Sequence, residues 1–582
     1  MSVQKQLQQA LQLHQSGHVA DAADLYAAVL RADPKNTDAL NLLGSIFIES
    51  GQLDTGIQLC QEAVNTAPDF FVPYVNLGNG LQAAGRLEEA ANAFQKAVDL
   101  NANSAIVYSN LGSALNALGR FDEAAEACED AVKLEPGFVG AYTNLGNARQ
   151  GLGDDEAALS AFQKAVELNQ NDSDAQYNLG TLFKRLEHYD DALAALEIAV
   201  KLDPNHVDKL YNLGLTLGEL SRYEEAEVHY QKCLAFAPDH EDALNNLSAT
   251  LKELGRLDEA EDYIRQALTA NPDNDELHWN LALVLLQQGR YEDGWAAYEH
   301  RWDAPGFTTP KRDFGKPAWN GDEAGDQTLL IHAEQGFGDA MLMARFVPWA
   351  AKRSQAVHVE CRPGLERLFA TLDGVASVTS YGDSLPTFDC HIAMMSLPHS
   401  FGLTLDTIPA DVPYLNVPDG IEADPCIGEA DGLKVGVVWA GNPTRIKDNE
   451  RSCDPDLFRQ LAEIDGVSLF NLQMGHGADG YSVLSELDNV FDVTPGLNDF
   501  ADTAAQIDAL DLVITVDTAV GHLAGALGKP VWGLHAANAS YLWLQEREDT
   551  PWYPTMRLFR QTTRGDWAGV MEQVVQELKA FK

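Results

Sequence analysis

Small residues recur at a strict 34-residue period through the first half of the chain. The series comprises Ala10, Gly44, Gly78, Gly112, Gly146, Gly180, Gly214, Ser248 and Ala282. Twelve residues after each stands a second small residue, and bulkier residues, Tyr26, Phe94 and Phe162 among them, follow four positions later. Small residues at matched positions let two helices approach closely, and a fixed period of this length is typical of a repeat array. The pattern predicts nine repeated units over residues 1–302.

The pattern changes after residue 302. Residues 303–326 are rich in Gly, Pro and charge and are predicted to form a linker. Beyond them, short apolar β-branched runs alternate with helical patterns, which is typical of parallel α/β units. The runs QTLLIHA, AVHVEC and FDCHIAM fall in residues 327–418, and LKVGVVWA, VSLFNLQ, DLVITVD and KPVWGLH fall in residues 430–582. We predict two doubly wound, Rossmann-like domains that bind ligands at the carboxyl ends of their strands.

The units of the first half resemble the tetratricopeptide repeat, whose 34 residues form two antiparallel helices. The resemblance implies a superhelix with a concave groove that holds an extended peptide. One position facing that groove in the repeat family is asparagine in seven successive units: Asn76, Asn110, Asn144, Asn178, Asn212, Asn246 and Asn280. A primary amide both donates and accepts, so this series resembles the peptide-binding asparagine ladder of the protein O-GlcNAc transferases. Alternatively, these residues are repeat consensus and satisfy neighbouring backbone.

Charge and composition restrict the partners. The chain has 40 Lys and Arg against 87 Asp and Glu, a net charge of −47, which argues against nucleic acid or an anionic membrane as the main partner. An anionic ligand therefore needs a local basic pocket. The N-terminus lacks the apolar core of a signal peptide and no apolar run reaches the ~18 residues of a membrane span, so we expect a cytoplasmic protein. The seven cysteines are widely spaced, form no CxxC, and are expected to be reduced packing residues.

Two loops that follow predicted strands carry candidate chemistry. In LLIHAEQGFGDAM, Gly336 and Gly338 permit a sharp turn and Asp339 stands near a helix start, where Asp is also an ordinary cap. GFGDAM lacks the third glycine of the dinucleotide fingerprint, so no NAD site is predicted. In VVWAGNPTRIKDNERS, Arg445, Lys447 and Arg451 either neutralise phosphate charge or balance neighbouring acids on an exposed surface.

A third loop follows the strand LVITV. Asp517 ends the strand, Thr518 is expected to help cap the next helix, and Gly521 leaves backbone accessible. Unpaired N–H groups and the helix dipole favour a phosphate at such a helix start. His522 lies one turn into that helix, where it can face the same ligand.

The segment DTAVGHLAGALGKPVWGL is similar to the signature of the bacterial heptosyltransferases, inverting glycosyltransferases of the two-domain GT-B fold. EQGFGD matches the N-terminal loop of that family, and WAGNP with its basic stretch matches the nucleotide-sugar loop. The resemblance implies that Asp339 is the base that takes the acceptor's hydroxyl proton, with Glu334 in reserve. It implies a nucleotide-sugar site without metal or cofactor, in which cations and backbone dipoles stabilise the leaving nucleotide. That site comprises Arg445, Lys447, Arg451, Gln473, Asp517, Thr518, Gly521 and His522.

The pairing of repeats with such a region resembles cytoplasmic protein O-glycosyltransferases, including those that modify bacterial flagellins. We therefore expect transfer of a sugar from a nucleotide donor to Ser or Thr of a protein in the groove, with flagellin and a nonulosonic acid as the best specific expectation. Two alternatives stay open. One is a scaffold with a degenerate transferase fold, because fold does not guarantee activity. The other is transfer to a glycolipid, as in the heptosyltransferases.

Overall fold

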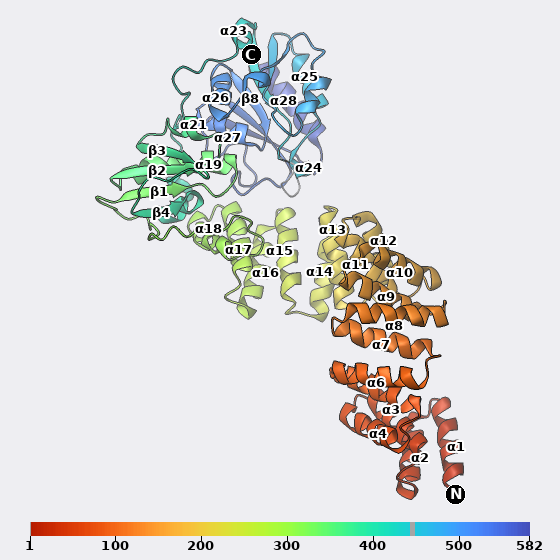
Figure 1. The fold of residues 1–582 in the computed structure, drawn as a ribbon. Coiled ribbons are helices and arrows are strands. Elements are labelled where there is room, and N and C mark those ends of the chain that lie inside the picture. The colour runs from red at the N-terminus through yellow and green to blue at the C-terminus, as the bar shows by residue number, and fades with distance from the viewer. Residues whose placement is uncertain (1, 443–447, 582) are drawn as a thin grey trace. The chain divides into compact units, whose positions relative to one another are not determined.

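The computed structural model describes residues 2–442 and 448–581, which divide into two compact units, Met1–Pro238 and Asp239–Lys582. The first unit contains seven helical hairpins that follow one another along the chain (Figure 1). Their helices are α1 Val3–Gln15, α2 Val19–Ala32, α3 Thr37–Glu49, α4 Leu53–Thr66, α5 Phe71–Ala83, α6 Leu87–Leu100, α7 Ala105–Ala117, α8 Phe121–Leu134, α9 Val139–Gly151, α10 Asp155–Leu168, α11 Ser173–Arg185, α12 Tyr189–Leu202, α13 Val207–Glu219 and α14 Tyr223–Phe236.

The second unit begins with two more hairpins of the same kind. These are α15 Glu241–Glu253 with α16 Leu257–Ala270, and α17 Asp275–Gln287 with α18 Tyr291–Tyr298, which ends in a 3-10 turn, η1 Glu299–Trp302. The described residues therefore contain nine helix pairs, and the predicted repeat array is confirmed. The last two repeats belong to the same compact unit as the α/β region, although the sequence pattern places the boundary after residue 302.

The small residues of the repeat make room for a bulky residue sixteen positions later. A Cβ added to Gly78 would lie 2.6 Å from the Phe94 ring, and one added to Gly44 would lie 2.6 Å from Cys60 Sγ. Cys60 is fully buried, and burial raises the pKa of its thiol to about 12. Cys60 is therefore an inert packing residue at the bulky position of its repeat, as predicted.

The segment 303–326 does not behave as a free linker. Trp319 N donates to His391 O at 2.8 Å, and Ala318 forms a parallel bridge with the same residue. Arg312 forms an ion pair with Glu360, which is 1% exposed. The segment therefore packs along the first sheet, and its Gly and Pro residues allow the chain to bend along that sheet.

The α/β region contains two parallel sheets. The first has the order β3-β2-β1-β4, with β1 Thr328–His332, β2 Ala356–Cys361, β3 Val375–Ser380 and β4 Cys390–Ala393. The second has the order β10-β9-β8-β5-β6-β7, with β5 Leu433–Val438, β6 Val467–Asn471, β7 Val490–Asp492, β8 Leu512–Val516, β9 Val531–His535 and β10 Met556–Arg560. All seven predicted strands are present, and the α/β prediction of two sheet domains is confirmed.

Short helices connect the strands of both halves (Figure 1). They are α19 Phe337–Met343, α20 Val347–Ala351, α21 Glu366–Phe369, α22 Leu397–Ser400, α23 Pro425–Glu429, α24 Asp448–Arg451, α25 Arg459–Ala462, α26 Phe500–Asp508, α27 Ala519–Ala526 and the terminal α28 Trp567–Phe581. The halves contact each other where α19 packs on α27 and where Arg367 pairs with Asp499 and Asp502. Among the described residues, no helix has the length and apolar character that a membrane span requires.

Candidate glycosyltransferase site

The predicted loops follow the carboxyl ends of β1, β5 and β8. The contact between α19 and α27 brings the first and third loops together, because Gly338 lies against the His522 ring. A Cβ at position 338 would lie 2.7 Å from His522 Cδ2, closer than Cβ atoms come to neighbouring heavy atoms. Glycine at position 338 is therefore required by a close approach between the two halves, one on each side of the candidate site.

Asp339 lies at the start of α19 and is half-buried. Its Oδ2 accepts a hydrogen bond from the backbone N–H of Gly336 at 3.2 Å, so the residue does cap its helix. The cap also fixes the direction of the carboxylate. Asp339 lines a small recess together with Glu334, Gln335 and Met395.

Glu334, the reserve base, is 3% exposed and paired with Arg301. Arg301 Nη2 donates to Glu334 Oε1 at 2.9 Å, and the backbone N–H of Met395 donates to the same oxygen at 3.2 Å. Burial, partly opposed by Arg301, raises the pKa of Glu334 to about 7. The carboxylate is thus committed to a buried ion pair, and Asp339 is the better placed of the two candidates.

Arg451 joins the second loop to the third. Its Nη1 donates to Asp517 O at 3.0 Å, and its Nε donates to Asp448 Oδ1 at 2.7 Å. The guanidinium therefore lies at the carboxyl end of β8 while also balancing an acid, so the two sequence interpretations of this residue are compatible. The predicted residues Arg445 and Lys447 lie outside the described residues.

Gln473 follows β6 and is 3% exposed. Its Oε1 accepts from Trp439 N at 3.1 Å and from Ala440 N at 2.9 Å, and its Nε2 donates to His476 O at 2.6 Å. Both ends of the amide have backbone partners. Gln473 thus holds the WAG loop in place, and its contact with the nucleotide stays a prediction.

Thr518 precedes α27. We predicted that its hydroxyl caps the helix, and this is wrong. The Oγ1 atom is engaged with Thr515 Oγ1 at 2.9 Å, and it is the Thr518 carbonyl that accepts the N–H of Gly521 at 3.1 Å. His522 is 5% exposed; its Nδ1 lies 3.1 Å from the Tyr553 hydroxyl and its ring stacks on Trp543. The imidazole is therefore held on one edge by Tyr553 and faces the Gly338 loop with the other.

The asparagine series has a structural role, in line with the alternative interpretation that these side chains satisfy neighbouring groups. All seven side chains are half-buried, and the Nδ2 atoms of Asn76, Asn144 and Asn280 donate across a repeat boundary to the residue 35 positions earlier, which is Asn41, Ser109 and Asn245 respectively. Asn212 likewise donates to Tyr177. Asn110, for which that earlier residue is Val75, donates to Asn79 instead. Five of the seven amides therefore link neighbouring repeats.

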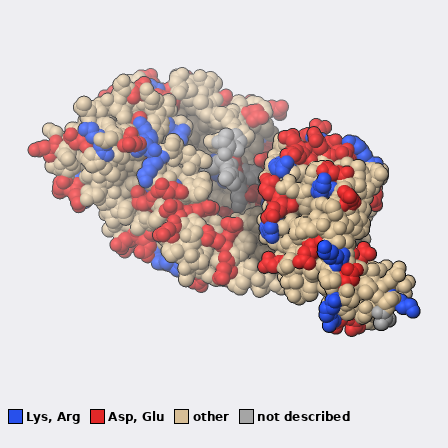
Figure 2. Space-filling view, turned by 60° about the horizontal axis from the view of Figure 1, so that its bottom comes forward, with Lys and Arg blue, Asp and Glu red and all other residues tan. Residues whose placement is uncertain are grey.

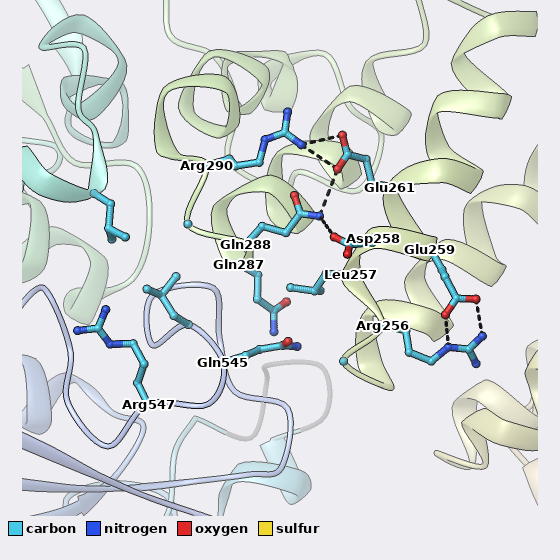
Figure 3. Close-up of a pocket in the computed structure, with 14 residues that line it drawn as sticks. Arg256, Leu257, Asp258, Glu259, Glu261, Gln287, Gln288, Arg290, Gln545 and Arg547 are labelled. Atoms are coloured by element: carbon cyan, nitrogen blue, oxygen red, sulfur yellow. Dashed lines mark hydrogen bonds and ion pairs between the residues drawn. The ribbon is translucent and has the colours of Figure 1, made fainter.

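A second cavity, of about 650 Å³, lies between repeats eight and nine and the loop after β9 (Figure 3). Figure 3 shows Arg290 paired with Glu261, and Arg256 paired with Glu259, inside this cavity. The third arginine of the lining, Arg547, is paired with Asp549. Each of these cations already has an acidic partner, as Arg451 does at the strand ends, so pairing alone does not favour either place for an anionic donor.

Acidic side chains are spread over the face shown in Figure 2, with basic side chains scattered among them. Among residues 2–442 and 448–581, no group of three or more His, Cys, Asp and Glu side chains is arranged to hold a metal ion.

Sequence reasoning missed three residues of this region. Tyr298 and Arg301 end the last repeat and contact the Glu334–Asp339 loop, and Tyr553 contacts His522. The sequence signal for Arg301 is a cation at a position that is Ala in the preceding repeat (Ala267) and Cys in the one before it (Cys233). Tyr298 occupies the bulky position of its repeat, and the repeat pattern alone therefore explained its presence without its contact with Gln335.

Family models match both parts of the chain. Tetratricopeptide-repeat models match residues 7–69, 75–137, 115–182, 207–273 and 246–301, and a model of anaphase-promoting complex, cyclosome, subunit 3 matches residues 153–233. The model of glycosyltransferase family 9 (heptosyltransferase) matches residues 481–564, which include Asp517 and His522 but not Asp339. The chain thus combines tetratricopeptide repeats with a glycosyltransferase family 9 domain, as the motifs predicted.

Individual relatives are similar over parts of the chain. Protein FlbA of Caulobacter vibrioides is 27% identical over 316 residues, which are 50% of this chain and 52% of FlbA. The chain therefore spans about half the length of this curated relative. Among solved structures, MamA is 30% identical over 28% of this chain and 94% of its own, with a TM-score of 0.26. YrrB, a tetratricopeptide-repeat protein with an unusual peptide-binding site, is 29% identical over 32% of this chain and 95% of its own, also with a TM-score of 0.26.

Proposed function

We propose that this chain is an inverting, metal-independent O-glycosyltransferase that acts on a protein held by its repeats. The observation that carries the proposal is the close approach of Gly338 to the His522 ring, since the loop of Gly338 also carries Asp339 and His522 belongs to α27. The family 9 domain supports the reaction class, and the repeat array supports a polypeptide acceptor.

In this proposal Asp339 takes the proton of a Ser or Thr hydroxyl while the hydroxyl oxygen attacks the anomeric carbon of the donor sugar. The bond from that carbon to the nucleotide phosphate breaks, and configuration inverts. Arg451 and the backbone N–H groups at the start of α27 stabilise the charge that develops on the departing phosphate. His522 borders the same ligand from within α27.

The acceptor that best suits the proposal is flagellin, and the donor is a CMP-activated nonulosonic acid. Both follow from the resemblance of the domain pairing to flagellin-modifying transferases. Asn178 supports an acceptor held by its backbone, because its amide makes no hydrogen bond with the described residues and an amide pairs with any sequence.

The test is intact-protein mass spectrometry of flagellin incubated with the purified chain and CMP-N-acetylneuraminic acid or another CMP-activated nonulosonic acid. The expected result is a mass increase of whole sugar units. Asp339→Asn should slow transfer by about 10²-fold or more, whereas Asp373→Asn, an exposed acid of the same domain, should not. Absence of any mass increase across such donors, or an Asp339→Asn variant as active as the parent, would overturn the proposal.

The heptosyltransferase family description also favours a second candidate, transfer to a glycolipid. Lipopolysaccharide offered as acceptor in the same assay distinguishes the two. A scaffold with an inactive transferase fold is distinguished by calorimetric titration with UDP, CMP, ADP and GDP, since it should bind none of them.

A further inference from the structure

The last repeat makes direct hydrogen bonds to the loop that carries the proposed base. Arg301, in the 3-10 turn that ends the array, is fully buried, and its Nη2 donates to Glu334 Oε1 at 2.9 Å and to Ser396 Oγ at 2.8 Å. Ser396 Oγ donates in turn to Glu299 Oε2 at 3.0 Å. One side chain of the repeat array therefore ties together the loops that follow β1 and β4.

A second contact fixes the next residue of the loop. Gln335 Nε2 donates to the Tyr298 hydroxyl at 3.1 Å, and Thr309 Oγ1 donates to the Glu334 carbonyl at 2.7 Å. Tyr298 is 3% exposed and packs edge-on against Trp295, with ring centroids 5.4 Å apart. The backbone of the loop is thus held from one side by residues of the ninth repeat and of the segment that follows it.

Asp339 is close to this support. Asp339 lines the same recess as Glu334 and Gln335, the two residues that Arg301 and Tyr298 hold. A shift of the loop at residues 334–335 would therefore move the Asp339 carboxylate as well, because Oδ2 of Asp339 accepts from the N–H of Gly336, the next residue of that loop, at 3.2 Å.

We propose that Tyr298 and Arg301 are positioning residues of the transferase centre, so that the ninth repeat is part of the machinery that places Asp339. Neither residue touches substrate in this proposal. They act through Gln335 and Glu334 by fixing the course of the loop, in the way that supporting hydrogen bonds hold other catalytic groups in productive geometry. The catalytic part of this inference rests on the proposed function.

The test compares Tyr298→Phe and Arg301→Lys with the matched control Tyr291→Phe in the full chain. Tyr291 is a buried tyrosine of the same helix, and its hydroxyl has no hydrogen-bond partner among the described residues. Hydrogen–deuterium exchange of peptides covering residues 333–342 reports the loop directly, without any substrate. Loss of one hydrogen bond should speed exchange there by about five- to tenfold in Tyr298→Phe, while Tyr291→Phe leaves it unchanged.

Kinetics supply the second readout. Where the parent transfers sugar from the CMP-activated donor, both variants should lower kcat by about tenfold and leave KM for the donor within about twofold, since only the transition-state geometry is affected. Unchanged exchange in Tyr298→Phe, or faster exchange with unchanged kcat, would overturn the inference. If Arg301→Lys does not fold, Tyr298→Phe decides alone. If the parent transfers nothing, the proposed function fails, and the exchange experiment still decides whether the ninth repeat holds the loop.

Discussion

Alanine substitution at two asparagines of the array separates repeat packing from acceptor binding. Asn144 Nδ2 donates to both the carbonyl and the hydroxyl oxygen of Ser109 in the preceding repeat, at 3.1 Å each, and Ser109 is 3% exposed. Asn178 occupies the same position of the next repeat, is half-buried, and its side chain makes no hydrogen bond with the described residues. The two residues are therefore matched in sequence context and differ in their contacts.

The expected magnitudes differ accordingly. Asn144→Ala leaves the buried Ser109 acceptors without their donor, which costs about 1–3 kcal/mol. Alanine recovers up to about 0.7 kcal/mol through its better helix propensity. We expect a net loss of about 1–2 kcal/mol for Asn144→Ala and a neutral or slightly stabilising effect for Asn178→Ala.

Urea unfolding of the full chain, followed by circular dichroism, measures this difference. Calorimetric titration with flagellin measures the other role, and Asn178→Ala should weaken binding if the groove amides hold the acceptor backbone. Equal stability losses in the two variants would refute the link between repeats that we assign to Asn144. Unchanged flagellin affinity in Asn178→Ala would instead refute its part in acceptor binding.

Three further expectations follow from backbone geometry and burial. Gly338→Ala should reduce transfer by about tenfold or more, because its Cβ would meet the His522 ring and push the two halves apart; a fully active variant would contradict this in the mass-increase assay. Glu187 has φ 61° at the turn position that is glycine in seven other repeats, so Glu187→Gly should stabilise the chain by about 0.5–1 kcal/mol and Gly153→Ala should destabilise it by about 1 kcal/mol, in urea unfolding; the opposite signs would refute the strain. Burial lowers the pKa of His535 from its unfolded value near 6.5 to about 4, so its contribution to stability is present above pH 6.5 and is lost as the pH falls towards 4. When the pH is lowered from 6 to 4.5, the free energy of unfolding should therefore fall less in His535→Gln than in the parent, by up to about 1.4 kcal/mol per pH unit. Identical pH profiles of the two proteins would exclude this titration.

The repeats and the interior strands were predictable because their signals are local and periodic. The strands that sequence reasoning missed lie at sheet edges. Residues 375–380 (VASVTS) form β3, which is half-exposed along most of its length, and β10 carries two arginines. An edge strand has one neighbour in the sheet and less need of apolar residues on both faces, so its composition does not stand out.

The site was predictable only as far as its residues lie in loops after strands. Asp339, Arg451, Asp517 and His522 were identified from such loops, since parallel strands deliver their carboxyl ends to one edge. The contact of Gly338 with His522 joins residues that are far apart in sequence, and no local pattern encodes it. For Gln473, the sequence did not reveal its backbone partners, because a polar residue after a buried strand is suited both to a ligand and to backbone groups.

A buried ion pair joins the last repeat to the α/β region, so the structural unit does not end where the repeat pattern ends. Arg301 stands at a repeat position that is Ala, Cys or Val in the eight earlier repeats, and its carboxylate partner Glu334 lies beyond the repeat pattern, 33 positions later. Separating the two would leave a carboxylate that is 3% exposed without its cation, and breaking a buried pair in this way costs about 3–5 kcal/mol. The tetratricopeptide pattern continues to residue 302 because it reflects the packing of two helices within each repeat, whatever else the repeat contacts. The compact unit starts at Asp239 because the ninth repeat packs on the transferase, and the eighth packs on the ninth.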